Sequence, residues 1–446
     1  MCIRDRYWLK AGQQAVHRFA DREAVGHLEK GLSVLLTLPD SPERARLELT
    51  LQTTLGPALM ATKGYAAPAV GEAYRRARDL CQQLKDITQL FPVVWGLWMY
   101  HLVRAEHEAA NAMTKQLLGV AQTTGDPDLA LEAHFAGGLS AFYCGELLAA
   151  REHLEQAISA YDPERHMELA STYGGLDPGV CCLEYVAWTL WLLGYPDQAL
   201  KRADEAQSLA KRGANLYTQT RSLYWDSLLR QFTGQWDVLR ERIEVAISMA
   251  TEHGFALVLA VGPIMRGWAL VTEGQAEEGI RQISQGLERY RATGAGFQLP
   301  HLMTPLIEAY KKIEQPEEGL TTLAEAQALV ENTGERYYEA ELQRLKGELM
   351  LAQSPDDATE AEACFHKALE IARGQQAKSL ELRTAMSLAR LWQAQDKEGE
   401  ARQLLNDVFD WFAEGFDTAD LREARALLDE LGPMKEVGIS GPRAAE

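Results

Sequence analysis

The amino-acid sequence predicts an all-α fold in which about ten helical hairpins of period near 40 stack into a right-handed superhelix. Two spacings support this prediction. Small or apolar residues recur in pairs seven positions apart, and successive pairs begin 40 to 49 positions apart. Glycines that follow helical stretches recur every 40 to 41 positions. Regular repeats of this length are typical of stacked hairpins, because a single hairpin cannot bury its own apolar face.

The paired residues mark the second helix of each predicted hairpin. Around the segment EACFHKALEIAR, the residues Ala361, Phe365, Ala368, Leu369 and Ala372 fall on one face of an α-helix. The second member of most pairs is Gly or Ala, which allows the next helix to approach closely. The pairs are Ala24/Gly31, Val70/Ala77, Ala110/Leu117, Ala150/Ala157, Ala199/Ala206, Leu239/Ala246, Gly279/Gly286, Gly319/Ala326, Ala361/Ala368 and Ala401/Val408.

The ends of the helices are marked by residues that favour caps. A glycine directly after a helix adopts the left-handed conformation at little cost, so it ends the helix. Ser or Asp before Pro supplies a capping oxygen and a first helical residue that needs no N–H partner. The predicted terminal glycines are Gly213, Gly254, Gly294, Gly334 and Gly374, and the predicted starts are Ser41-Pro42, Asp126-Pro127 and Ser354-Pro355.

The turn inside each hairpin indicates which repeat class the chain resembles. The turns are legible in LLGYPDQAL, VTEGQAEEGI and KIEQPEEGL. The period is longer than the 34 residues of tetratricopeptide repeats and is similar to that of HEAT repeats. The glycine-containing turn and the alanines of the second helix favour the tetratricopeptide design. In such an array stability is expected to be nearly a sum of repeat and neighbour terms.

The predicted superhelical domain covers residues 7–431. Its one major irregularity is an insertion at 161–180, and TADLREARALLDEL supplies a closing helix. Insertions in solenoids often fall on a binding edge. Residues 1–6 (MCIRDR) match neither the helical pattern nor a targeting signal and are interpreted as an assembly scar. Residues 432–446, rich in Gly and Pro, are expected to form a disordered tail.

Composition excludes several classes of function. The net charge of −19 disfavours nucleic-acid binding, because acidic surfaces repel phosphate. No segment is long and apolar enough to predict a membrane span. The six cysteines include no CxxC spacing, which favours a reducing, cytoplasmic location.

The linear sequence offers no catalytic, cofactor-binding or metal-binding motif. There is no GxxxxGK[ST] phosphate loop, and HEAAN (107–111) has Asn111 where a zinc protease needs its second histidine. Cys364 and His366 are two apart on a helix and point to different sides, so we expect them to hold no metal. An enzyme would need an acid–base cluster that the linear sequence does not reveal.

Aromatic residues recur on the predicted first helices of hairpins three to seven. In the tetratricopeptide pattern their positions tend to face the concave surface, where they would anchor a peptide or protein partner. The alternative is that they fill the core between repeats. These candidate groove residues are Trp95, Phe135, Phe142, Trp188, Trp191, Tyr224 and Trp268.

Several longer segments resemble a known class of bacterial signalling protein. They are LGPALMATKGYAAPAVGEAYRRARDLCQQL, DPGVCCLEYVAWTLWLLGYPDQAL, GERYYEAELQRLKGELMLAQS and EGFDTADLREARALLDEL. They are similar to the C-terminal tetratricopeptide region of fusions between an adenylate/guanylate cyclase, an AAA or STAND-type ATPase and a repeat array. The resemblance covers residues 7–431 and implies a bacterial regulatory arm that acts on upstream ATPase and cyclase domains.

The sequence therefore predicts a non-catalytic protein-interaction or sensor domain without a cofactor. Its expected partners are a protein or peptide in the concave groove and the ATPase and cyclase domains of a longer parent chain. Two alternatives stay open. One is a small-molecule sensor of the STAND type, which a closed, polar-rimmed cavity would favour. The other is an enzyme whose site is hidden in the linear sequence.

Overall fold

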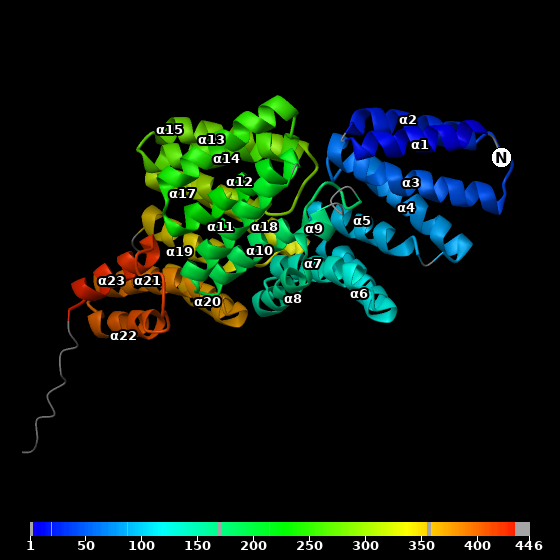
Figure 1. Cartoon of the computed structure of the whole chain (residues 1–446). Coiled ribbons are helices and arrows are strands. Elements are labelled where there is room, and N and C mark those ends of the chain that lie inside the picture. Colours follow the sequence, from blue (N-terminus) through cyan, green and yellow to red (C-terminus); the bar gives the residue numbers. More distant parts are fainter. Residues whose placement is uncertain are drawn as a thin grey trace, which may run out of the picture.

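A computed structural model describes residues 3–18, 20–86, 88–167, 172–213, 215–354 and 358–432, and no strand occurs among them. The helices form a compact superhelix with α1 to α4 at one end and α22 and α23 at the other (Figure 1). None of the helices in the described ranges combines the length and the apolar character that crossing a bilayer requires.

Ten antiparallel helix pairs make up the described superhelix, and they confirm the predicted hairpins. Three further helices lie outside the pairs: α9 (Pro163–His166), α16 (Leu299–Leu302) and the closing helix α23 (Ala419–Glu430). The pairs are α1 (Ile3–His17) with α2 (Asp21–Leu35), α3 (Pro42–Lys63) with α4 (Pro68–Leu84), α5 (Leu90–Val103) with α6 (His107–Thr124), α7 (Pro127–Tyr143) with α8 (Leu147–Ala160), α10 (Pro178–Leu192) with α11 (Pro196–Arg212), α12 (Leu216–Thr233) with α13 (Trp236–His253), α14 (Ala256–Thr272) with α15 (Ala276–Ala292), α17 (Thr304–Lys312) with α18 (Pro316–Thr333), α19 (Glu339–Gln353) with α20 (Ala358–Gln375), and α21 (Lys378–Ala394) with α22 (Glu398–Phe409).

The residue pairs seven apart lie on the second helices, as predicted, and all of them are buried. In the α14–α15 hairpin, small residues at these positions allow the two helix backbones to approach closely. A Cβ on Gly279 would lie 2.5 Å from the carbonyl oxygen of Gly267, and one on Gly286 would lie 2.9 Å from that of Ala260. The two helix backbones therefore touch along this seam, which a larger side chain would force apart.

The predicted helix caps are confirmed in part. Ser41 and Asp126 accept hydrogen bonds from backbone N–H groups of the first helical turn. Gly254, Gly294 and Gly334 have positive φ, as the prediction requires. Gly213 and Gly374 do not end helices this way. The cap predicted at Ser354-Pro355 falls partly outside the described residues.

Gly213 and Gly374 correct the prediction. Gly213 has φ −75°, so it is not left-handed. Gly374 lies inside α20, and Gln376, directly after this helix, adopts the left-handed conformation with φ 58°. Both glycines lie at the positions that the repeat period predicts. After α20, however, the left-handed residue is Gln376, two positions after Gly374.

Gly254 and Gly374 should therefore respond oppositely to replacement by alanine. Gly374→Ala is expected to raise the free energy of unfolding by about 0.5–1 kcal/mol, because alanine favours the helix and no atom lies within 4 Å of the new Cβ. Gly254→Ala, at φ 78° and equally open, is expected to lower it by about 1 kcal/mol. Urea unfolding of both variants measures the sign of the change in the free energy of unfolding. The same sign for both variants would contradict the assignment of the two helix ends.

Successive turns of the superhelix touch, which sequence analysis did not anticipate. The third hairpin contacts the eighth, where Gly296 N donates to Val103 O over 2.8 Å. The fourth contacts the ninth, where Arg336 N donates to Tyr143 O over 2.7 Å. The fifth contacts the tenth through Ser379 Oγ and the carbonyl oxygen of Trp191, 188 residues apart. The expectation that each repeat contacts only its neighbours is therefore wrong.

Candidate functional site

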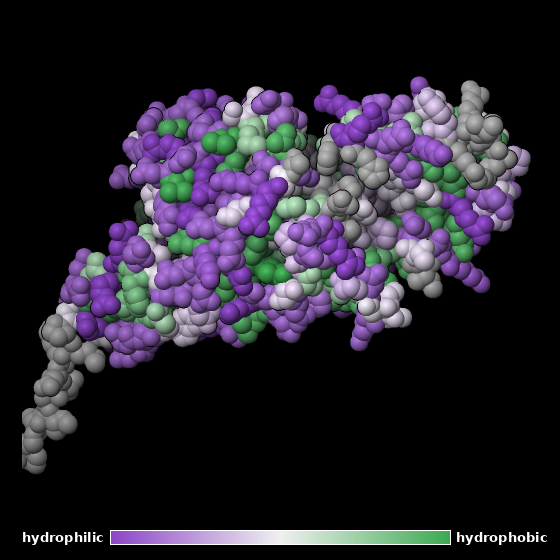
Figure 2. Space-filling model, in the orientation of Figure 1, coloured by the Kyte–Doolittle hydropathy of each residue, from purple (hydrophilic) through white to green (hydrophobic). Residues whose placement is uncertain are grey.

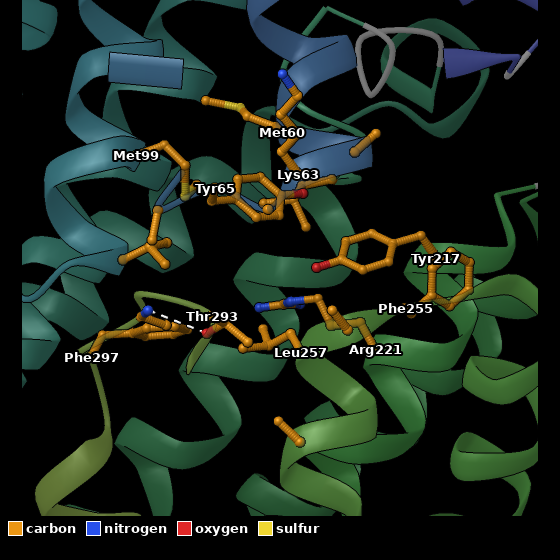
Figure 3. Close-up of a pocket in the computed structure, with 18 of the residues that line it drawn as sticks. Met60, Lys63, Tyr65, Met99, Tyr217, Arg221, Phe255, Leu257, Thr293 and Phe297 are labelled. Carbon is orange, nitrogen blue, oxygen red and sulfur yellow. Dashed lines mark hydrogen bonds between the residues drawn. The ribbon is translucent and has the colours of Figure 1, made fainter. Parts of the chain in front are cut away.

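A cavity of about 620 Å³, partly open to solvent, lies along the axis of the first superhelical turn. First helices of hairpins two to seven form its wall, together with the end of α15 and the loop that follows it. The lining consists mostly of apolar and aromatic side chains (Figure 3). They include Met60, Tyr65, Met99, Leu102, Phe135, Leu139, Tyr185, Tyr217, Phe255, Leu257 and Phe297.

The loop between α9 and α10, part of the predicted insertion, helps to close this cavity. Tyr65 donates through its hydroxyl to Gly174 O over 2.5 Å, and Asn215 Nδ2 donates to Gly175 O over 2.9 Å. Leu176 then contributes to the lining, while Tyr173 packs against Trp95 with ring centroids 4.9 Å apart. The described part of the insertion therefore folds inward, over the axis.

Arg221 is the one deeply buried charged residue among the described residues that line the cavity. It is 7% exposed, and Figure 3 shows its guanidinium directed into the cavity. Its Nη1 donates to the Glu184 carboxylate and contacts Cys181 Sγ at 3.3 Å. The guanidinium carbon lies 4.7 Å from the ring centroid of Trp225. Burial raises the pKa of the Glu184 carboxyl above its ordinary value, although Arg221 opposes that shift.

All seven predicted groove residues are buried, which corrects the expectation of an exposed aromatic groove. Their exposed fractions range from 0% to 9%. The second superhelical turn covers the inner face of the first. The ring of Phe142, for example, lies 4.6 Å from that of Tyr337. The residues concerned are Trp95, Phe135, Phe142, Trp188, Trp191, Tyr224 and Trp268.

The inner face is therefore a packed aromatic interior, which was the alternative considered for these residues. Trp188 and Trp191 both contact Phe232, with ring centroids 5.7 and 4.2 Å apart. Phe135 still lines the axial cavity, and Trp268 lines the second cavity described below, so these two remain candidates for ligand contact. Figure 2 shows a mainly hydrophilic outer face over α11 to α15, with hydrophobic residues in small separate patches.

The second cavity, of about 330 Å³, lies between α14, α17, α19, α21 and α23 and is strongly charged. Arg344 donates to Glu341 and also contacts Glu348. Arg383 donates through Nε to Asp420 over 2.8 Å. These charges are paired with one another, so the network joins the helices of the second turn and leaves little unused hydrogen-bonding capacity.

Residues considered for metal binding or nucleophilic chemistry have ordinary surroundings. Cys364 Sγ lies 3.9 Å from Met350 Sδ, whereas His366 Nε2 lies 3.7 Å from a carboxylate oxygen of Glu362. Within the described ranges, no group of three His, Cys, Asp or Glu side chains is placed to hold a metal ion. Burial raises the pKa of the Cys181 thiol, which disfavours the reactive thiolate.

Sequence analysis missed the axial cavity and Arg221. A usable signal was present, since Arg221 lies among the aromatic residues of LYTQTRSLYWD, on the first helix of its hairpin. A charged residue on the inner side of such a helix must be paired or must face a cavity. The period alone does not show that the inner side is enclosed.

Comparison with known proteins identifies the fold. No protein-family model matches the chain. An uncharacterized protein of Rhizobium meliloti (strain 1021) is 24% identical over 390 residues, which make up 86% of this chain and 37% of that protein. The chain thus spans well under half the length of this relative.

Solved structures of helical-repeat proteins resemble the chain along most of its length. A Rap protein complexed with competence and sporulation factor has a TM-score of 0.53 and 13% identity, over 90% of this chain and 99% of that protein. The apo quorum sensor NprR from B. thuringiensis has a TM-score of 0.49 and 13% identity, over 83% of this chain and 99% of that protein. The chain therefore shares the tetratricopeptide-like α-solenoid fold.

Proposed function

We propose that this chain is a non-catalytic sensor domain whose axial cavity takes up a small, mainly apolar ligand. The cavity carries the proposal: it has a volume of about 620 Å³, is bordered by six first helices and is lined by aromatic and Met side chains with few polar groups. Small-molecule sites in proteins have this size and character. The limited volume and mainly apolar lining of the cavity favour the small-molecule sensor over an extended peptide groove.

The lining gives no support to an enzyme. No Asp, Glu, His or Cys occurs among the described residues of the cavity wall. Such groups are among those that general acid–base and nucleophilic catalysis use most often. Uptake of a ligand is therefore the activity that the wall supports.

The sensor is proposed to act within a longer protein. The matched region makes up 37% of the Rhizobium meliloti relative, which supports a place for this array beside other domains. The resemblance to cyclase–ATPase fusions suggests that those domains are the ones it regulates. The solved Rap protein, which has this fold, is complexed with competence and sporulation factor.

A neutral apolar probe tests the proposal. N-phenyl-1-naphthylamine is expected to bind in a saturable manner with increased fluorescence. Leu139→Trp, which fills the cavity from α7, should weaken this binding about tenfold or more. Leu148→Trp adds the same side chain at an exposed site on α8 and serves as the control. Absence of saturable binding, or equal binding by both folded variants, would contradict the proposal.

A further inference from the structure

We infer that the axial cavity selects an anionic ligand, with an apolar body and one carboxylate or equivalent acid group that pairs with Arg221. The inference rests on the proposed function and names the chemical class of its ligand. Two observations carry it: the buried position of Arg221 in a wall without carboxylates, and the hydrogen bonds that Arg221 leaves unused.

The lining is cationic in an acidic protein. The chain has 64 acidic and 45 basic residues. The described cavity wall nevertheless contains three cations, Lys63, Arg221 and Arg289, and no carboxylate. Glu184 lies behind Arg221 and balances much of its charge, so the preference for an acid group comes from the guanidinium donors that face the cavity.

Part of the hydrogen-bonding capacity of the Arg221 guanidinium is unused. Its contacts to Glu184 and Cys181 both involve Nη1, and Nε and Nη2 donate to none of the described residues. Glu184 and Trp225 hold the guanidinium in place from outside the cavity. A carboxylate can bind such a preorganised guanidinium through two parallel hydrogen bonds, from Nε and Nη2.

Tyr217 adds a second polar contact beside Arg221. It also lies on α12 and lines the cavity, and Figure 3 shows its hydroxyl directed towards the space above the guanidinium. A ligand oxygen at Nη2 could therefore also accept from this phenol. The apolar part of the ligand would then contact Met60, Met99 and Phe135.

The other two cations lie at the edge of the cavity. Lys63 and Arg289 are exposed, and Lys63 Nζ lies 3.7 Å from a carboxylate oxygen of Glu29. Exposed charges are screened by salt and contribute little to affinity. Selectivity for the acid group is therefore assigned to Arg221.

A matched pair of fluorescent probes provides the test. N-phenyl-1-naphthylamine and 1-anilinonaphthalene-8-sulfonate have the same aromatic body, and the second adds a sulfonate. At physiological salt, the sulfonate is expected to bind the unmodified protein about tenfold more tightly than the neutral probe. Arg289→Met, at the edge, should leave this ratio nearly unchanged.

The variants at the Arg221 site are designed so that the protein still folds. Removing Arg221 alone would leave Glu184 buried without its partner, which is strongly destabilising. The double variant Arg221→Met/Glu184→Gln removes both charges and should bind the two probes equally.

The outcomes separate the two proposals. Failure of the neutral probe to bind the unmodified protein would overturn the proposed function. Binding of both probes with equal affinity, or an unchanged ratio in a folded double variant, would overturn only the anion selectivity. Displacement of the sulfonate by decanoate would support a small acid as ligand, and displacement by a blocked tripeptide with a free carboxylate would support a peptide end. Displacement by neither would exclude both of these ligand classes.

Discussion

Cutting the chain at Gly254 is expected to give two fragments that reach their native fold only when mixed. The halves 1–254 and 255–446 contact each other where the sixth and seventh hairpins pack together. They also contact each other where the second superhelical turn covers the first. Phe142 and Tyr337, for example, pack together from opposite halves, and Tyr224 donates through its hydroxyl to Gln298 Oε1 over 3.0 Å. Separating the halves would expose these buried aromatic side chains to water, which is unfavourable in free energy.

Circular dichroism and size-exclusion chromatography measure this result. Each fragment alone should show less helicity per residue than the intact chain, and the mixture should recover it as a one-to-one complex. Gly296→Val in the second fragment should block recovery, because its Cβ would lie 2.9 Å from Arg104 O. Gly399→Val, with no atom within 4 Å, is the control. Two fully helical fragments that do not associate would show that neighbour contacts alone hold the array.

Glu132→Gln is expected to stabilise the protein at pH 8 by roughly 2–4 kcal/mol. Glu132 is 1% exposed on α7, and neither carboxylate oxygen has a hydrogen-bond partner within the described part of the chain. Burial raises the pKa of this carboxyl from 4.5 to about 8, with Asp177 adding to the rise and Trp95 opposing it. The folded state therefore favours the protonated acid, and its stability falls as the pH rises from about 4.5 to about 8.

Urea unfolding at pH 5 and pH 8 tests the sign. At pH 5 the acid is protonated in the folded chain but already mostly ionised in the unfolded chain, so Glu132→Gln should stabilise the protein by only about 1 kcal/mol or less. Glu331→Gln removes an exposed carboxylate and should have almost no effect at either pH. A stabilisation by Glu132→Gln that is the same at both pH values would show that ionisation is not its cause.

The helices could be predicted from the sequence because their signals are local. Ala361 and Ala368 mark one face of one helix, and both are fully buried there. The same kind of signal was misleading at Gly374, because a glycine at the repeat period can also lie within the last turn of a helix.

The enclosed interior could not be predicted in this way. Whether Trp188 is exposed depends in part on His301, whose ring lies 5.7 Å from it but 113 residues further along the chain. The small rotation between successive hairpins sets this closure, and no local spacing encodes it. Arg221 was overlooked for the same reason, since its importance depends on a cavity that six separate helices border.

Contact between the third and eighth, fourth and ninth, and fifth and tenth hairpins restricts how such a gene can change in length. Duplicating or deleting a single unit between Tyr143 and Arg336 would bring the wrong hairpin opposite every partner in the next turn. An open array can grow by one repeat, because each unit needs only its neighbours. Here, single-unit duplications would be lost by selection, and length would vary mainly through loops such as the one between α8 and α10.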